Sequence, residues 1–239
     1  MKANRLCIGR GMIKRVGDVL KSAKIKGKIM YVSDLNVDGL YGEMVKNQLC
    51  KIGVYQTEYV SNHSLAYADS LINKAQSDEV GCIVGLGGGS VLDVCKYVAF
   101  TLKKPLMLIP TTAANDGIAS TIAVLKGDDG KPKSLMCARA PMIVIDTELI
   151  YSAPIQLIKA GIGDILSNYT ALLDWRLAFE RGKDTINGYA YLMSKNAIDT
   201  ILQSRYKKIC IEQLSGIHLQ LKSFPSFPFE GIKISCVQY

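Results

Sequence analysis

Short apolar runs alternate with stretches whose apolar residues recur at helical spacing over the first 150 residues. Short runs bounded by Gly, Pro or Asp are typical of buried strands, and the periodic stretches are typical of helices. Strands are predicted at residues 6–8, 28–34, 54–60, 80–86, from 105 and at 141–146, and helices at 9–27, near 39–51, at 66–76 and at 90–100. This alternation predicts an α/β fold built on a mostly parallel sheet.

Two segments depart from that alternation. Residues 121–137 form two predicted strands joined by a turn at Asp128, Asp129 and Gly130, which indicates an antiparallel hairpin attached to the sheet. From residue 153 the pattern becomes helical, first over 154–179 and then over 189–202. We therefore expect a domain boundary near 151–154, where Pro154 suits a first helical turn.

A glycine cluster lies between a predicted strand and a helix in the segment GLGGGSVLDVCKYVAF, residues 85–100. Gly87, Gly88 and Gly89 lack a Cβ atom and can adopt positive φ, so their N–H groups can approach an anion. Ser90 is predicted to open the helix, whose first N–H groups and dipole favour negative charge. The cluster predicts a pyrophosphate site, although a plain tight turn uses the same residues. It matches neither G-x-G-x-x-G nor a Walker A loop.

Polar residues also follow other predicted strands. The segment PLMLIPTTAANDGIAS, residues 105–120, leads from a strand into a loop rich in Thr, Asn, Asp and Gly. Loops at the carboxyl ends of parallel strands form the ligand crevice of open α/β sheets, so this loop and the glycine turn should face one crevice. Ser33 and Asp34 end another strand, where Asp34 suits a ribose and either residue suits a helix N-cap.

Composition narrows the possible partners. The net charge of +8 suits anionic ligands, but the lysines are scattered and no basic run is interleaved with stacking aromatics, so no nucleic acid is expected. Seven cysteines without a C-x-x-C pair suggest neither a disulfide framework nor a cysteine zinc site, which fits a cytoplasmic protein. We find no signal peptide and no apolar run of the roughly 18 residues that membrane insertion needs.

A third segment, GIGDILSNYTALLDWRLA at residues 161–178, places Asp164 after a Gly-x-Gly bend and beside an apolar helix face. Without further information, an aspartate in this position is interpreted as a helix cap, a solvated surface residue or a metal ligand. Together, the three segments resemble the iron-containing alcohol dehydrogenases of the glycerol dehydrogenase-like branch, and most closely the sn-glycerol-1-phosphate dehydrogenases. The first two segments are shared with dehydroquinate synthases, and SNYTALLDW points to the glycerol-1-phosphate enzymes.

The resemblance runs from Lys28 to about Leu214 and implies a dehydroquinate synthase-like architecture. Residues 1–153 would be a Rossmann-like NAD(P)-binding domain, 154–214 part of an all-helical metal and substrate domain, and 215–239 a divergent tail. The cofactor-binding residues that the resemblance implies are Asp34, Gly87, Gly88, Gly89, Ser90, Val91, Thr111, Thr112, Ala114 and Ser120.

The resemblance also implies a reaction. Asp116 matches a residue that holds substrate, and Asp164 matches an aspartate that ligates a catalytic zinc ion and touches substrate. Zinc would polarise the ketone of dihydroxyacetone phosphate, a phosphorylated small-molecule substrate, and NADH or NADPH would deliver hydride to give sn-glycerol 1-phosphate. A glycerol dehydrogenase and a non-catalytic nucleotide-binding remnant are the alternatives.

The sequence departs from the family pattern in two respects. The family completes its zinc site with two histidines, whereas this chain has only His63, which reads as a surface loop residue, and His218, which lies in no family motif. Around residues 212–216 the resemblance gives way to a Phe- and Pro-rich segment, as a frameshift, a truncated product, a degenerate copy or a real alternative C-terminus would produce. Uncovered apolar helix faces would then favour a homo-oligomer.

Overall fold

The computed structural model describes residues 5–114, 116–137 and 140–203. Its strands are β1 Arg5–Gly9, β2 Lys28–Ser33, β3 Tyr55–Tyr59, β4 Val80–Gly87, β5 Leu106–Pro110, β6 Ile122–Lys126, β7 Pro132–Met136 and β8 Met142–Asp146. Its α-helices are α1 Val16–Ser22, α2 Leu35–Val37, α3 Glu43–Leu49, α4 Leu65–Ser77, α5 Gly89–Thr101, α6 Thr147–Ser152, α7 Ile155–Glu180 and α8 Gly188–Gln203. Shorter helices are a 3-10 helix at Met12–Arg15, a π-helix at Asp38–Gly42 and a 3-10 helix at Gly117–Ala119.

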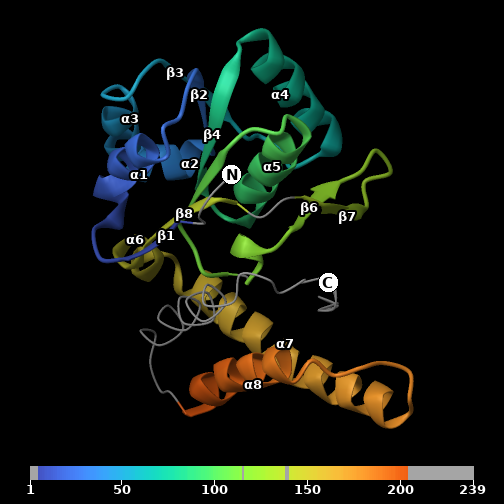
Figure 1. Ribbon diagram of the computed structural model, residues 1–239. Coiled ribbons are helices and arrows are strands. Elements are labelled where there is room, and N and C mark those ends of the chain that lie inside the picture. The colour runs from blue at the N-terminus through green and yellow to red at the C-terminus, as the bar shows by residue number, and fades with distance from the viewer. Residues whose placement is uncertain (1–4, 115, 138–139, 204–239) are drawn as a thin grey trace. The chain divides into compact units, whose positions relative to one another are not determined.

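Six strands form one sheet in the order β1-β8-β5-β4-β2-β3, and all of their pairings are parallel. The predicted α/β fold is therefore confirmed. In Figure 1, helices α1 and α3 cover one face of this sheet and helices α4 and α5 cover the other. Covering on both faces explains why the central strands are continuous apolar runs rather than alternating ones.

The core of the first face joins strand residues to α1 and α3. Tyr31 and Val84 lie in it with Leu20 of α1 and Leu49 of α3, and all four are fully buried. On the opposite face, α5 packs so closely on the sheet that Cys95 contacts the strand at Gly85. Burial of these large apolar side chains supplies the main driving force for forming the sheet.

Residues near the N-terminus are fixed by Asp146 at the end of β8. The fully buried carboxylate of Asp146 accepts hydrogen bonds from the N–H groups of Gly11 at 3.1 Å and Ile13 at 2.9 Å. Strand β1 pairs with β8 in the register Arg5 to Met142. A buried charge needs such donors, so Asp146 ties the 3-10 helix to the sheet.

The helix predicted near residues 39–51 begins earlier than expected. Asp34 caps α2, because its side chain accepts a hydrogen bond from the N–H of Val37 at 2.9 Å. The chain then passes through the π-helix into α3. The sequence pattern gave no sign of the π-helix, in which Gly42 leaves room for the carboxylate of Asp38; a Cβ at Gly42 would lie 1.9 Å from Asp38 Oδ1.

Asp38, the first residue of this π-helix, has three hydrogen-bond donors around its carboxylate. It accepts hydrogen bonds from Tyr31 at 2.9 Å, Lys46 at 2.6 Å and Tyr59 at 2.8 Å. Burial raises the pKa of the Asp38 carboxyl, but these hydrogen bonds and the positive charge of Lys46 outweigh it and hold the pKa below its ordinary value. The cluster therefore links the π-helix and α3 to strands β2 and β3.

The predicted hairpin is present, with β6 and β7 antiparallel. It was expected to be attached to the main sheet, whereas β6 and β7 form a separate two-stranded sheet. Strand β6 packs against α5 instead of hydrogen-bonding to a sheet strand. Its inward residues Ala123 and Leu125 are fully buried, whereas β7 is mostly exposed.

The chain divides into two compact units, one formed by residues 1–112 and 117–152 and the other by 113–116 and 153–239. In the second unit, α7 and α8 pack against each other around Ile165, Leu172, Ala197, Ile198 and Ile201. None of the helices in the described part of the chain is long and apolar enough to cross a membrane. The five cysteines within the described ranges are all free thiols.

Candidate functional site

The glycine turn joins the end of β4 at Gly87 to the start of α5 at Gly89, one residue before the predicted start at Ser90. Gly88 is the N-cap residue, with φ −81° and ψ −176°, and no side chain caps the helix. Gly87, Gly88 and Gly89 do not use the positive φ that glycine permits. The first N–H groups of α5 therefore receive no capping hydrogen bond from the side chain of the N-cap residue.

Close packing, rather than an unusual φ, explains why glycine is needed at this turn. A Cβ at Gly87 would lie 2.8 Å from Val91 Cβ, and one at Gly88 would lie 3.3 Å from Thr112 Cγ2. A bare helix N-terminus in a space that a Cβ would fill fits a pyrophosphate group. Val91 itself is buried against Gly87, so its side chain serves packing.

The first two loop residues after β5 lie beside this turn. Strands β4 and β5 pair in the register Gly87 to Pro110, and the N–H of Thr111 donates to the carbonyl of Gly87 at 3.1 Å. Thr111 is largely buried, and Thr112 reaches the position that a side chain at Gly88 would occupy. Parallel pairing thus places the threonines next to the glycine turn, as expected of loops at strand carboxyl ends.

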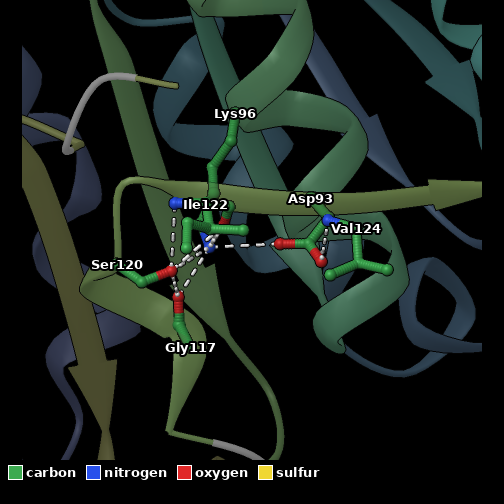
Figure 2. Close-up of polar contacts among 6 residues, drawn as sticks. All are labelled: Asp93, Lys96, Gly117, Ser120, Ile122 and Val124. Atoms are coloured by element: carbon green, nitrogen blue, oxygen red, sulfur yellow. Dashed lines mark hydrogen bonds and ion pairs between the residues drawn. The ribbon is translucent and has the colours of Figure 1, made fainter. Parts of the chain in front are cut away.

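Ser120 lies farther along the same loop and is held by the first unit. Its hydroxyl lies 2.9 Å from the carbonyl oxygen of Gly117 and 3.0 Å from that of Ile122. The ammonium group of Lys96 lies 3.5 Å from the Ser120 oxygen (Figure 2). The segment around Ser120 is therefore fastened to α5, the helix that begins at the glycine turn.

Two carboxylates predicted from sequence meet in the second unit. The N–H of Asp116 donates to Asp164 Oδ2 at 2.9 Å. Burial and the negative charge of Asp164 raise the pKa of the Asp116 carboxyl to about 6, while a hydrogen bond with Asn168 lowers it. The pair offers acceptor oxygens in a partly dehydrated setting, where hydrogen bonds to hydroxyl groups are strengthened.

Helix α7 carries Asp164, and the Gly-x-Gly bend expected before it is absent. Gly161 and Gly163 lie inside the continuous helix Ile155–Glu180. A Cβ at Gly161 would lie only 1.8 Å from the carbonyl oxygen of Ala113, so this glycine lets the segment 113–116 pack on α7. Ala114 belongs to that same segment.

Asn168 is a site residue that the sequence interpretation missed. It is 9% exposed and hydrogen-bonds to Asp116. It follows Asp164 by four residues, so both side chains project from one face of α7. That spacing was the signal available in the sequence.

The described residues do not complete a zinc site. No group of three His, Cys, Asp or Glu side chains able to hold a metal ion occurs in residues 5–114, 116–137 and 140–203. His63 is exposed in the loop before α4, and His218 lies outside the described residues. Because a catalytic zinc ion takes three protein ligands, Asp164 alone does not fit one.

Asp34 and Ser33 differ in what they do. Asp34 is the N-cap of α2, which confirms one of the two roles predicted for it. Ser33 is not a cap, because its buried hydroxyl donates to the carbonyl of Leu86 in β4 at 2.8 Å. The ribose role of Asp34 stays a prediction.

A family model described as iron-containing alcohol dehydrogenase matches residues 7–154. The chain belongs to this family. The matched range includes the glycine turn and the threonine loop with Asp116, which are two of the three segments that carry the resemblance, and the third segment, residues 161–178, lies beyond it.

Several curated relatives of this chain share one name. The glycerol-1-phosphate dehydrogenase [NAD(P)+] of Methanosarcina mazei is 35% identical over 199 residues, which are 82% of this chain and 55% of that protein. The protein of the same name from Methanococcoides burtonii is 36% identical over 222 residues, 92% of this chain and 61% of that protein. The chain thus spans little more than half the length of these curated relatives.

A solved structure shows the same fold. Glycerol dehydrogenase from Schizosaccharomyces pombe matches with a TM-score of 0.72 and 21% sequence identity, over 90% of this chain and 60% of that one. At this identity the likeness establishes the architecture and not the substrate.

Proposed function

We propose that this chain binds NAD(P)H at the glycine turn, as part of an enzyme that reduces dihydroxyacetone phosphate to sn-glycerol 1-phosphate. The observation that carries the proposal is the uncapped N-terminus of α5, where Gly87 and Gly88 leave no room for a side chain. A pyrophosphate would accept hydrogen bonds from the N–H groups of Gly89 and Ser90. Its negative charge would be favoured by the helix dipole.

The substrate part of the proposal rests on Asp116 and Asp164. When bound, NAD(P)H supplies a hydride for the ketone carbon, and a proton taken up by the ketone oxygen completes the alcohol. The carboxylates of Asp116 and Asp164 would accept hydrogen bonds from substrate hydroxyl groups, and Asn168 would hold Asp116 in place. The phosphorylated substrate follows the name of the relatives at 35–36% identity.

The first test is NADH binding followed by turnover. NADH fluorescence is titrated with the purified chain, and NADH oxidation is then followed with dihydroxyacetone phosphate or unphosphorylated dihydroxyacetone, with and without added zinc. Oxidation with the phosphate alone supports the proposed reaction, and oxidation with dihydroxyacetone alone supports a glycerol dehydrogenase. Absence of binding of both NADH and NADPH would overturn the proposal altogether.

A second candidate is nucleotide binding without turnover. The observation that favours it is that the described residues hold no group of three His, Cys, Asp or Glu side chains able to bind a metal ion. NADH binding without oxidation by either ketone supports this candidate. Asp164→Asn is the matched variant: it should leave NADH binding unchanged under both candidates, but it should abolish turnover only if the chain is a reductase.

A further inference from the structure

Lys96 is a charged residue buried within α5, two turns after the glycine turn. Its side chain is 2% exposed and ranks among the largest fully buried side chains of the chain. A buried ammonium ion is costly unless its charge is paired and its three N–H groups all have acceptors. The groups that contact Lys96 therefore indicate which part of the structure this buried charge stabilises.

Three acceptors surround the ammonium group of Lys96, as Figure 2 shows. It donates to the carbonyl oxygens of Gly117 at 2.6 Å and Ile122 at 3.1 Å, and it lies 3.1 Å from Asp93 Oδ1. Three donors thus meet three acceptors, and the hydroxyl of Ser120 at 3.5 Å is a fourth, longer neighbour. The two carbonyls bracket the segment that carries Ser120.

Asp93 binds one further backbone group of the segment that Lys96 holds. Its Oδ1 pairs with Lys96, and its Oδ2 accepts a hydrogen bond from the N–H of Val124 at 3.0 Å. One pair of side chains on α5 therefore fixes residues 117–124 at three backbone groups. All of these residues belong to the first unit.

We infer that Lys96, paired with Asp93, is a positioning residue for the dinucleotide. It holds the segment 117–122 against the helix whose N-terminus forms the proposed phosphate site, and so fixes Ser120 relative to that site. Lys96 itself does not touch the cofactor, since its three donors are used within the protein. The inference rests on the proposed function, because it presumes that NAD(P)H binds at the turn and that Ser120 contacts it.

The test is NADH binding by variants of the full chain. Lys96→Met removes the donors at similar length and should raise the NADH Kd about tenfold, because small misplacements of a binding group cost that much or more. Lys104→Met, at an exposed lysine just beyond α5, should leave the Kd unchanged. If the parent chain binds neither NADH nor NADPH, the proposed function fails and this inference with it. If it binds NADH and Lys96→Met binds equally well, the inference alone fails.

A second variant keeps the test decisive should Lys96→Met not fold. Lys96→Met leaves Asp93 as an unpaired, partly buried charge, whereas the double variant Asp93→Asn and Lys96→Met removes both charges and keeps an acceptor for Val124. If positioning matters, the double variant folds and still binds NADH weakly. A return to parental affinity would show that only the unpaired charge mattered and would overturn the inference.

The route through Ser120 is tested by a double-mutant cycle. Ser120→Ala should weaken NADH binding in the parent chain and add little in the Asp93→Asn and Lys96→Met background, because the segment is already released there. Hydrogen exchange at residues 117–124 should be faster in that background. Fully additive effects on the Kd would show that Lys96 does not act through Ser120.

Discussion

Gly87 illustrates how a missing side chain, rather than a special backbone angle, shapes the turn. The space for a Cβ at this position is taken by Val91, one turn into the helix that follows. The same holds at Gly85, where a Cβ would lie 2.6 Å from Cys95 Sγ. These two glycines set the distance between β4 and α5.

Gly87→Ala should therefore destabilise the first unit and weaken NADH binding. The added methyl group forces Val91 or the turn to move, at a cost of about 1–3 kcal/mol. Thermal unfolding and NADH titration measure the two effects. Gly53→Ala is the matched control, since nothing lies within 4 Å of a Cβ there, and it should change neither quantity. Parental behaviour of Gly87→Ala would contradict the packing argument.

Asp38 gives a pH-dependent prediction at the residue scale. Its pKa is lower in the folded than in the unfolded chain, so its contribution to stability is present above the unfolded pKa and is lost as pH falls through the folded pKa. Asp38→Asn should cost about 1–3 kcal/mol at pH 7, since charged hydrogen bonds from three donors are weakened.

The difference between the parent chain and Asp38→Asn should begin to shrink as pH falls below about 4, where the carboxyl of the unfolded parent becomes protonated, and should be lost only below the lower pKa of the folded parent. Urea unfolding at a series of pH values measures it. Asp18→Asn removes an exposed carboxylate as a control and should stay within a few tenths of a kcal/mol of the parent at every pH. A difference independent of pH would show that the charge of Asp38 does not stabilise the fold.

At the scale of elements, the helices differ in how they begin. Ser64 caps α4 by accepting a hydrogen bond from the N–H of Tyr67 at 3.1 Å, and Asp34 caps α2 in the same manner. Helix α5 begins at Gly88 without a side-chain cap. Helix α7 also begins without a side-chain cap, after Pro154, but α5 follows the sheet strand β4 directly through the glycine turn, which is why we place the cofactor there.

The two roles of Asp34 can be separated by substitution. Asp34→Ala should lower the free energy of unfolding by about 1 kcal/mol, because the cap of α2 is lost. Asp34→Ser keeps a capping oxygen and should restore stability. If Asp34 also holds the ribose, Asp34→Ser should still bind NADH several-fold more weakly than the parent. Equal NADH affinity of Asp34→Ser and the parent would leave the cap as the sole role.

Local patterns predicted most elements but not their fine structure. The apolar run at residues 80–86 predicted β4, because a strand buried on both faces needs apolar residues throughout. The helical spacing after it predicted α5, because apolar residues recur with the 3.6-residue period of a helix. The π-helix left no such mark, since it depends on Asp38 being drawn towards Tyr31, Lys46 and Tyr59. Lys96 was overlooked because two of its three acceptors are backbone carbonyls, which any sequence could supply.

At the scale of the molecule, the strand order was beyond the reach of local patterns. Alternating strands and helices indicate a parallel sheet, but they do not say that β1 pairs with β8 or that β6 and β7 leave the sheet. The meeting of Asp116 with Asp164 was likewise unpredictable from either segment, because it depends on Gly161 admitting the segment 113–116 against α7. The sequence resemblance, rather than residue patterns, connected the two aspartates.

Two separate cores predict two separable stabilities. The core that includes Val84 and Leu20 shares no residue with the core around Ile198 among the described residues. Ile198→Ala should cost about 2–5 kcal/mol in the second unit, and hydrogen exchange should accelerate in α7 and α8 while β4 and β5 stay protected. Leu192→Ala, at a position 54% exposed on α8, is the control and should have little effect. Equal loss of protection in both units would show a single cooperative structure.

The pairing of β1 with β8 also sets an order of events on the ribosome. Strands β2 to β5 can find their neighbours while the chain is still being made, but Gly11 waits for Asp146, 135 residues later. At about 5–20 residues per second, that wait is roughly 7–27 s. During it, the apolar side chains of β1 have no sheet edge to join and are available to chaperones. The beginning of the chain is thus among the last parts of the sheet to reach its place.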